Sequence, residues 1–234
     1  MALTLGNAPK PTGNSKPCPP GNHCGRCFSV VDLGTHTTTG QYGTKTNRKI
    51  RVAWEFPEET HVFDEKKGPE PYVTSKTYNF VLGEKSNLLN DLQAWRGQPF
   101  TDEELMTFEL KKLIGQVCMV QVIQQTKGDK TYANVEAITT MPKKFKEQMP
   151  AAVNAPIYYE LDMGQGATFQ ALPEFLQKLI KTCNEWGGKP EEQSQVPAGD
   201  NPPLDQREKP PATGKGPTQN PEDEDSIPFA ANYL

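Results

Sequence analysis

Positively charged and aromatic side chains recur together in three stretches of this chain of 234 residues. Lys and Arg neutralise phosphates, and aromatic faces stack on bases whatever the sequence of those bases is. The combination is the chemistry of a surface for single-stranded nucleic acid, although each residue alone reads equally as a half-buried sheet residue or a solvated charge. The candidates are Tyr42, Lys45, Arg48, Lys49, Arg51, Tyr72, Lys76, Tyr78, Lys127, Lys130 and Tyr132.

A second group of reactive types lies near the N-terminus, where Cys18, His23, Cys24 and Cys27 follow one another closely. Thiolates and an imidazole at such distances can complete a tetrahedral zinc site. The spacing C-x5-C-x2-C is irregular, so we favour free thiols and no bound metal, with zinc as the alternative. Five cysteines, an odd number, also fit a reducing compartment better than a disulfide framework.

Signatures of catalysis are missing from the sequence. The stretch 40–46 has neither the spacing of a phosphate-binding loop nor a helix after it, and Phe169 stands where a dinucleotide fingerprint starting at Gly164 requires its third glycine. None of the three histidines lies in HExxH or beside an evident nucleophile. We therefore expect no enzyme and no cofactor.

The elements that must position the candidate residues follow from periodicity. Residues 27–33 read as a strand, 34–47 as a long loop, and 48–56 as a strand with Ile50, Val52, Trp54 and Phe56 on its apolar side. The stretch 57–71 carries turn residues, and 72–82 resumes the composition of a strand.

Helical spacing then replaces alternation. Ser86 is a good N-cap for a helix over 86–95 that ends before Gly97, and Thr101 to Glu104 fit a capping box. Residues 117–126 and 131–142 predict an antiparallel hairpin. A last helix over 172–186 has an apolar face to dock on the core, formed by Phe175, Leu176, Leu179, Ile180 and Cys183. Trp54, Trp95 and Cys118 are also assigned to the core.

Three strands, a helix and a two-stranded hairpin follow the order of the OB-fold, a five-stranded Greek-key barrel. We therefore predict a mainly β protein with a helix between strands three and four and a C-terminal helix; an open α+β sheet is the alternative. Such barrels bind single strands across strands two and three, between the loop joining strands one and two and the loop joining strands four and five. The candidate residues fall in those segments.

Composition divides the chain into three parts. Residues 1–26 hold five prolines and predict a flexible arm, 27–186 predict the folded domain, and 187–234 predict a disordered linker and tail with four Lys/Arg against nine Asp/Glu. No apolar run approaches the roughly 20 residues that span a bilayer, and no signal-peptide pattern opens the chain. We expect a soluble protein inside the cell.

The last residues closely resemble the acidic tip of bacterial single-stranded DNA-binding proteins. Glu222, Asp223, Glu224 and Asp225 precede Ile227, Pro228 and Phe229, although here the chain continues to Leu234. In that family the tip recruits replication, recombination and repair enzymes, and it competes with DNA for the barrel. The resemblance implies partner binding by these seven residues.

The body resembles single-stranded DNA-binding proteins of OB-fold type from bacteriophages and prophages. The similarity covers roughly residues 20–145, through GRCFSVVDLGT (25–35), RKIRVAWEFPE (48–58), SNLLNDLQAWRGQPFTDEEL (86–105) and TYANVEAITTMPK (131–143). It implies DNA binding in phage replication or recombination, in the cytoplasm of a bacterial host.

Together the sequence predicts a non-enzymatic protein that binds single-stranded DNA largely without sequence preference and recruits enzymes through its tail. A protein-interaction adaptor and a strand-annealing recombination protein are the alternatives. Self-association into a homo-oligomer stays open.

Overall fold

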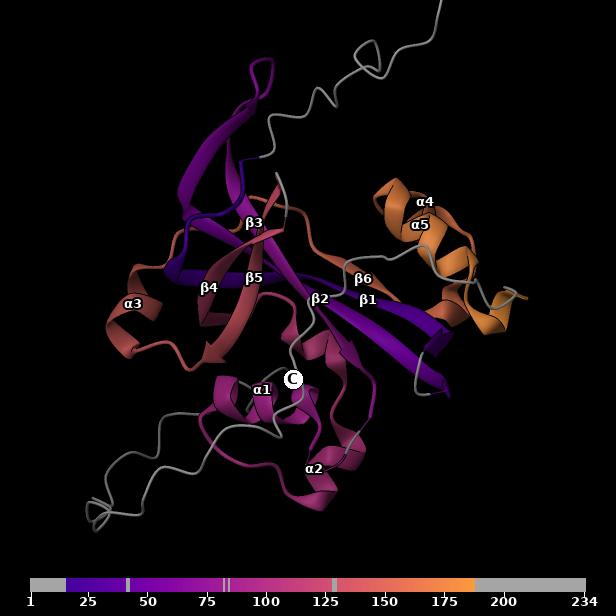
Figure 1. Cartoon of the computed structure of the whole chain (residues 1–234). Helices are drawn as coiled ribbons and strands as arrows, with labels where there is room; N and C mark the ends of the chain where they lie inside the picture. Colours follow the sequence, from indigo (N-terminus) through magenta and orange to yellow (C-terminus); the bar gives the residue numbers. More distant parts are fainter. Residues whose placement is uncertain (1–15, 41–42, 82, 84, 128–129, 188–234) are drawn as a thin grey trace, which may run out of the picture.

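The computed structural model describes residues 16–40, 43–81, 83, 85–127 and 130–187. Its main element is a six-stranded sheet in which β1 to β5 pair in the order β3-β2-β1-β4-β5, each pair antiparallel, while β6 lies parallel to β1 (Figure 1). The strands are β1 (Gly21–Gly40), β2 (Gly43–Asp64), β3 (Gly68–Asn79), β4 (Val117–Lys127), β5 (Lys130–Thr139) and β6 (Ile157–Tyr159).

The first two strands are much longer than the sequence pattern indicated. The segment 34–47, expected to be a long loop, lies mostly in a β1–β2 ribbon in which Thr37 pairs with Thr46 and Thr39 with Thr44. Threonine favours strands, and the ribbon buries little, so its residues show no apolar alternation. Pairing of β2 with β3 likewise extends through much of 57–71.

Regular structure also begins before residue 27, where the predicted arm was to end. β1 starts at Gly21 and pairs with β4 from Gly21 to Arg26. Cys18 and His23 are buried, with 4% and 5% of their surface exposed. Residues 1–15 and 188–234 lie outside the described part of the chain.

In the described part of the chain, five helices accompany the sheet: α1 (Asn87–Arg96), α2 (Asp102–Thr107), α3 (Lys143–Gln148), α4 (Ala167–Gln170) and α5 (Glu174–Lys181), with short 3-10 turns at Leu110–Leu113, Leu161–Met163 and Asn184–Trp186. The capping predictions are confirmed. Ser86 Oγ accepts from the Leu89 amide, Gly97 ends α1 with φ 84°, and Thr101 and Glu104 form the capping box of α2. α5 is shorter than the predicted helix over 172–186.

Two apolar cores share β1. The first joins the sheet to α1 and contains Trp54 and Trp95, whose rings lie 5.8 Å apart, together with Cys118. The second joins the other side of β1 to β6, α4 and α5, and contains Val31, Leu33, Ile180 and Cys183. The core predictions for both tryptophans, Cys118 and Cys183 are confirmed. Burial on both faces explains why Val30, Val31 and Leu33 follow one another closely in the middle of β1.

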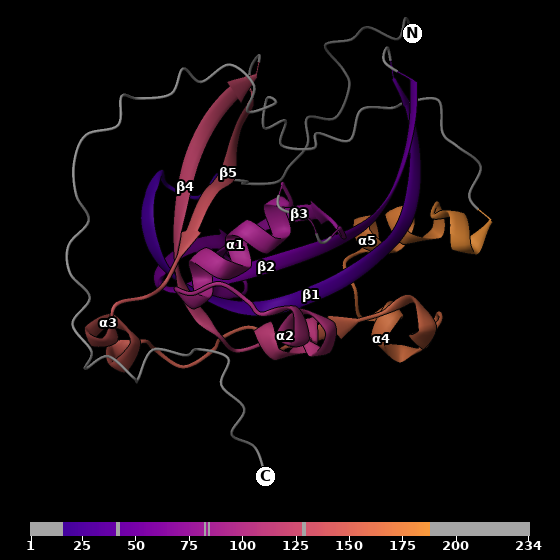
Figure 2. The same ribbon diagram turned by 90° about the horizontal axis from the view of Figure 1, so that it is seen from below.

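The sheet is open between its two edge strands, β3 and β5. β3 and β5 end the pairing path, and the described residues show no ladder between them, although α1 packs against both. Figures 1 and 2 place α4 and α5 together on the other side of β1 and β2 from the β4–β5 hairpin. The mainly β class is confirmed, whereas the described residues form an open six-stranded sheet and not the predicted closed barrel of five strands.

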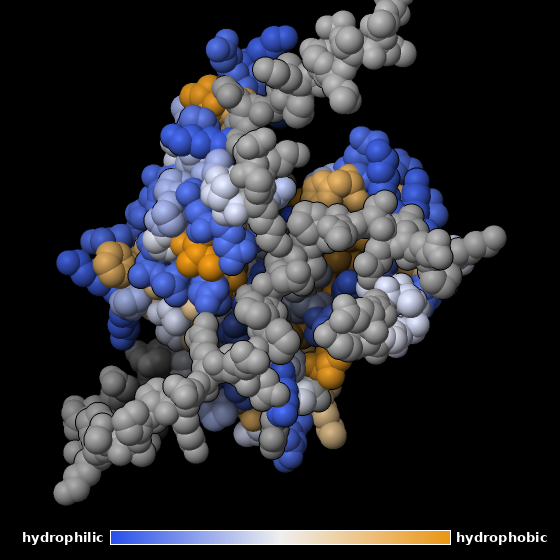
Figure 3. All heavy atoms as spheres, viewed as in Figure 1, coloured by the Kyte–Doolittle hydropathy of each residue, from blue (hydrophilic) through white to orange (hydrophobic). Residues whose placement is uncertain are grey.

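The visible surface in Figure 3 is mostly hydrophilic, with hydrophobic residues in separate spots. One of these spots lies beside α4 and α5. In the part of the chain that the structure describes, no helix has the length and apolar character needed to cross a membrane.

Candidate nucleic-acid interface

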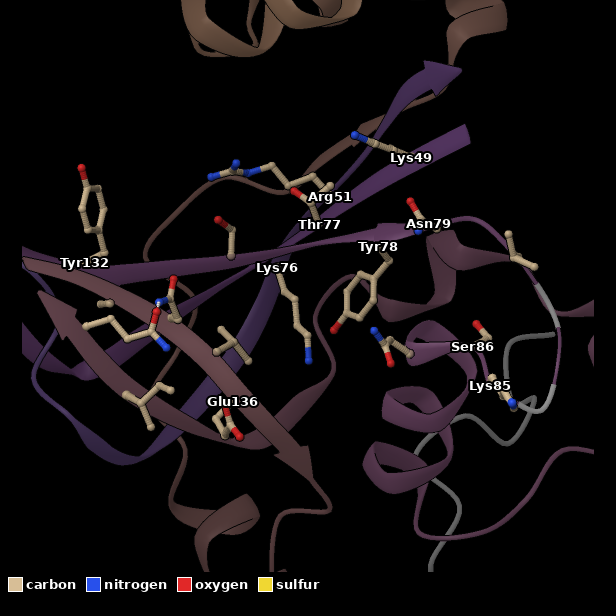
Figure 4. Close-up of a pocket in the computed structure, with 18 of the residues that line it drawn as sticks. Lys49, Arg51, Lys76, Thr77, Tyr78, Asn79, Lys85, Ser86, Tyr132 and Glu136 are labelled. Atoms are coloured by element: carbon tan, nitrogen blue, oxygen red, sulfur yellow. Dashed lines mark hydrogen bonds between the residues drawn. The ribbon is translucent and has the colours of Figure 1, made fainter. Parts of the chain in front are cut away.

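Two adjoining hollows lie along the open seam between β3 and β5. The first, called the groove below, has a volume of about 740 Å³ and is lined by β2, β3, the start of α1, β4 and β5 (Figure 4). The second, of about 630 Å³, is lined by residues 16–18, the first half of β3, β5 and residues 153–154. Ser75, Tyr132 and Ala133 line both, so the two hollows adjoin.

Four cationic side chains line the groove: Lys49, Arg51, Lys76 and Lys85. Lys76 is neutralised, because its Nζ lies 2.7 Å from Asp91 Oδ2 and the side chain is only 13% exposed. Among the described residues, the other three have no carboxylate within ion-pair distance. They outnumber Glu136, the carboxylate that also lines the groove, and give it a net positive charge, which attracts phosphate.

Arg51 is the groove cation whose pKa is most clearly changed by its surroundings. Burial lowers the pKa of its guanidinium, which nevertheless stays protonated, as arginine does in proteins. A partly desolvated cation without a counterion is costly, and a phosphate at this position would offset that cost. The guanidinium carbon lies 5.1 Å from the ring centroid of Phe175 on α5.

Tyr132 is the predicted aromatic residue that reaches the groove with an accessible ring. It is half-buried on β5 and stands at the groove edge in Figure 4, across the groove from Lys85 and Ser86. Its position suits stacking on a base.

Tyr72 and Tyr78 were predicted to stack on bases, and the structure corrects this assignment. They are only 6% and 4% exposed, and both belong to the first core. Tyr78 donates to Asp91 Oδ2 at 2.8 Å, and Tyr72 packs on His61 at 5.8 Å between ring centroids. Burial raises the pKa of both phenols. Neither ring offers a free face, because the alternating side of β3 that carries them faces inward.

Lys45 and Arg48 lie on the β1–β2 ribbon and do not line the groove. Arg48 Nε lies 3.3 Å from Asp32 Oδ1, and its guanidinium carbon lies 5.9 Å from the Phe80 ring centroid. Its charge is therefore paired.

The side chains of three further candidates lie outside the described part of the structure. Tyr42 lies outside the described residues, and so do the side chains of Lys127 and Lys130, whose backbones pair at the end of the β4–β5 hairpin. The acidic residues and the Ile-Pro-Phe of the tail, 222–229, also lie outside the described part.

Sequence reasoning missed several polar groups of the groove: Asn79, Lys85, Asn87, Gln125, Asn134 and Glu136. Isolated amides carry no spacing signal. The pairing of β2 with β3 explains how Asn79 reaches the groove. Asn79 pairs with Lys49, and Thr77 with Arg51, so these four residues lie on one patch of the sheet. Glu136 is an exposed carboxylate within an otherwise cationic groove.

The four residues weighed as a zinc site are not gathered around one point. His23 pairs with Glu59 through Nδ1, lies 2.9 Å from the Pro19 carbonyl through Nε2, and stacks on Phe56. Cys27 is fully buried, with its Sγ directed to the Ser29 carbonyl. Within the described residues, no three His, Cys, Asp or Glu side chains are grouped to hold a metal ion, and all five cysteines are free.

Comparison with known proteins adds no relative to this picture. No protein-family model matches the chain, and no curated protein matches it either.

Proposed function

We propose that this protein binds single-stranded DNA, largely without sequence preference, in the groove between β3 and β5. The observation that carries the proposal is that one groove is lined by Tyr132 and by three cations, Lys49, Arg51 and Lys85, that have no ion-pair partner among the described residues. In this proposal the strand order is that of an OB-type barrel with β3 and β5 as its unpaired seam.

The chemistry of the groove suits a flexible polyanion. Phosphates displace counterions when they meet Lys or Arg, and this gives affinity that does not depend on base sequence. Asn79, Asn87 and Asn134 add donors and acceptors that serve any base or sugar. No group is needed for bond cleavage, and the protein acts without enzymatic activity.

The chain outside the described residues has a complementary part in this proposal. Its tip, Glu222 to Phe229, resembles the partner-binding peptide of bacterial single-stranded DNA-binding proteins, so we propose that it recruits replication or recombination enzymes, in phage DNA metabolism inside a bacterial host. The folded part then holds the DNA while the tail holds the enzyme.

Charge reversal tests the groove directly. Lys49→Glu combined with Arg51→Glu removes two phosphate contacts, so the plot of log affinity against log salt becomes shallower by about 1.4 for a single strand. Lys144→Glu combined with Lys146→Glu is the matched control, because these exposed lysines lie on α3 outside the groove and change net charge equally.

Fluorescence anisotropy of a labelled oligothymidine measures both variants. Weaker binding and a shallower slope for the groove variant, with the control close to the wild type, support the proposal. Equal losses in both variants would show that net charge alone attracts DNA and would contradict a defined groove. Unchanged function after groove reversal would favour the protein-interaction adaptor.

A further inference from the structure

Phe175 is an apolar residue of α5 that does not join the core. Leu176 and Ile180 are 4% and 0% exposed and belong to the second core, whereas Phe175 is 54% exposed. Its predicted place on the docking face of the helix is wrong, because one residue turns a helix by about 100° and carries Phe175 away from the side occupied by Leu176. The exposed ring therefore has no role in holding α5 to β1.

The ring lies instead against a cation of the groove. The Arg51 guanidinium carbon is 5.1 Å from the Phe175 ring centroid, so a β2 residue that lines the groove also touches α5. In both ribbon views, β2 lies between α5 and the β4–β5 hairpin that carries Tyr132 (Figures 1 and 2). Phe175 consequently extends the aromatic and cationic surface beyond the groove.

The surroundings of the ring favour a polyanion over a protein partner. Lys178 follows one turn later, and it is 74% exposed in an ion pair with Glu174, itself 80% exposed, at 2.7 Å. Such an exposed pair is weak, which leaves the lysine free to exchange its partner for a phosphate. The exposed charges of Glu174 and Lys178 on the same helix suit a polyanion better than an apolar protein surface.

We propose that single-stranded DNA leaving the groove across β2 stacks one base on Phe175, with Arg51 and Lys178 meeting the phosphates on either side. The inference rests on the proposed function and extends it from the seam of the sheet to α5. The C-terminal helix then does more than complete the fold, since it supplies a second stacking platform beyond Tyr132.

Substitution of the exposed ring tests this platform in the full-length protein. Loss of one stacked base weakens binding of oligothymidine roughly 5- to 140-fold in Phe175→Ala. The salt slope stays as in the wild type, because the ring carries no charge. Phe145→Ala on α3 is the matched control, since Phe145 is 48% exposed and lies away from the groove, and it binds as the wild type does.

A second variant allows stacking to be measured by fluorescence, independently of affinity. Phe175→Trp keeps a stacking face and binds as the wild type does, and its added indole emission is quenched by oligothymidine. Trp54, Trp95 and Trp186 supply a background that is subtracted with the unsubstituted protein.

The outcomes separate this inference from the function on which it rests. If the wild type binds oligothymidine but Phe175→Ala binds equally well and the Phe175→Trp emission does not change, the platform is refuted and the groove stands. If the wild type binds no oligothymidine at low salt, the proposed function fails and the inference fails with it.

Discussion

Glu136 is the residue in the groove whose charge opposes the proposed ligand. Its carboxylate is exposed on β5 and lines the same hollow as Arg51 and Lys49. Like-charge repulsion between this carboxylate and a phosphate weakens binding by the small free energy typical of exposed charges. In the proposed function, the acid thus moderates the affinity of the groove for DNA.

Glu136→Gln removes that repulsion and keeps the size of the side chain. We expect oligothymidine binding to tighten up to about fivefold at low salt, with the gain fading as salt screens the charge. Anisotropy titrations at two salt concentrations measure this. Glu147→Gln, an exposed acid on α3, is the control, and an equal gain there would show a net-charge effect.

A second residue-scale prediction concerns Glu104, which pairs with the buried Arg96 and accepts from the Thr101 amide at 2.9 Å. The Arg96 guanidinium and this amide lower the pKa of the Glu104 carboxyl from its ordinary 4.5 to about 2. A depressed folded-state pKa gives stability that is fully present above about pH 4.5 and is lost as pH falls towards 2.

Glu104→Gln is therefore less stable than the wild type at neutral pH, and the gap closes between about pH 4.5 and pH 2. Urea unfolding at a series of pH values checks the sign. A gap that stays constant down to pH 2 would show that the ionised carboxylate is not the stabilising form.

At the scale of elements, one buried carboxylate attaches the segment before β6 to the sheet. Glu55 on β2 is fully buried and accepts from the amide of Val153 at 3.1 Å and from the amide and the side chain of Asn154, both at 2.7 Å. These two residues also line the second hollow. Glu55 thus shapes the hollow that adjoins the groove.

Glu55→Ala removes the acceptor of three N–H donors and leaves a cavity where the buried carboxylate was, so it lowers the free energy of unfolding by about 2 to 5 kcal/mol. Glu55→Gln retains one acceptor oxygen and costs less. Glu58→Ala, at an exposed position on the same strand, changes stability by no more than about 0.5 kcal/mol. Urea denaturation compares the three, and equal stability of Glu55→Ala and Glu58→Ala would refute the attachment.

Elements defined by neighbouring residues were predictable from the sequence. The caps at Ser86 and at Thr101, the β4–β5 hairpin and the burial of Trp54 follow from patterns within a few positions. Glu55 shows the limit, because the alternation of β2 put it on the polar side, and the segment that covers it lies about a hundred residues later. Local periodicity carries no information on such a cover.

The candidate site divides in the same way. Lys49, Arg51 and Tyr132, chosen from their residue types, do line one groove. Tyr72 and Tyr78 are buried, because the side of β3 that carries them faces the core. The long β1–β2 ribbon was missed because threonines on a solvated ribbon do not alternate with apolar residues. Phe175 was assigned to the core because a one-residue offset on a helix is hard to resolve from composition.

At the scale of the whole molecule, the groove and the C-terminal tail carry net charges of opposite sign. Residues 187–234 carry nine acids against four bases, so in the proposed function they compete with DNA for the cations of the groove. A chain ending at Gly187 is expected to bind oligothymidine more tightly at low salt, with the difference vanishing at high salt. Weaker binding after truncation would mean that the tail contributes contacts to DNA.

The most direct test of the account compares a single strand with a duplex of the same sequence, using full-length protein and anisotropy at several salt concentrations. Three groove cations predict a slope of log affinity against log salt of about −2 or steeper, and affinity for the single strand well above that for the duplex. Equal affinity for both forms, or no binding of the single strand at low salt, would contradict the proposed groove.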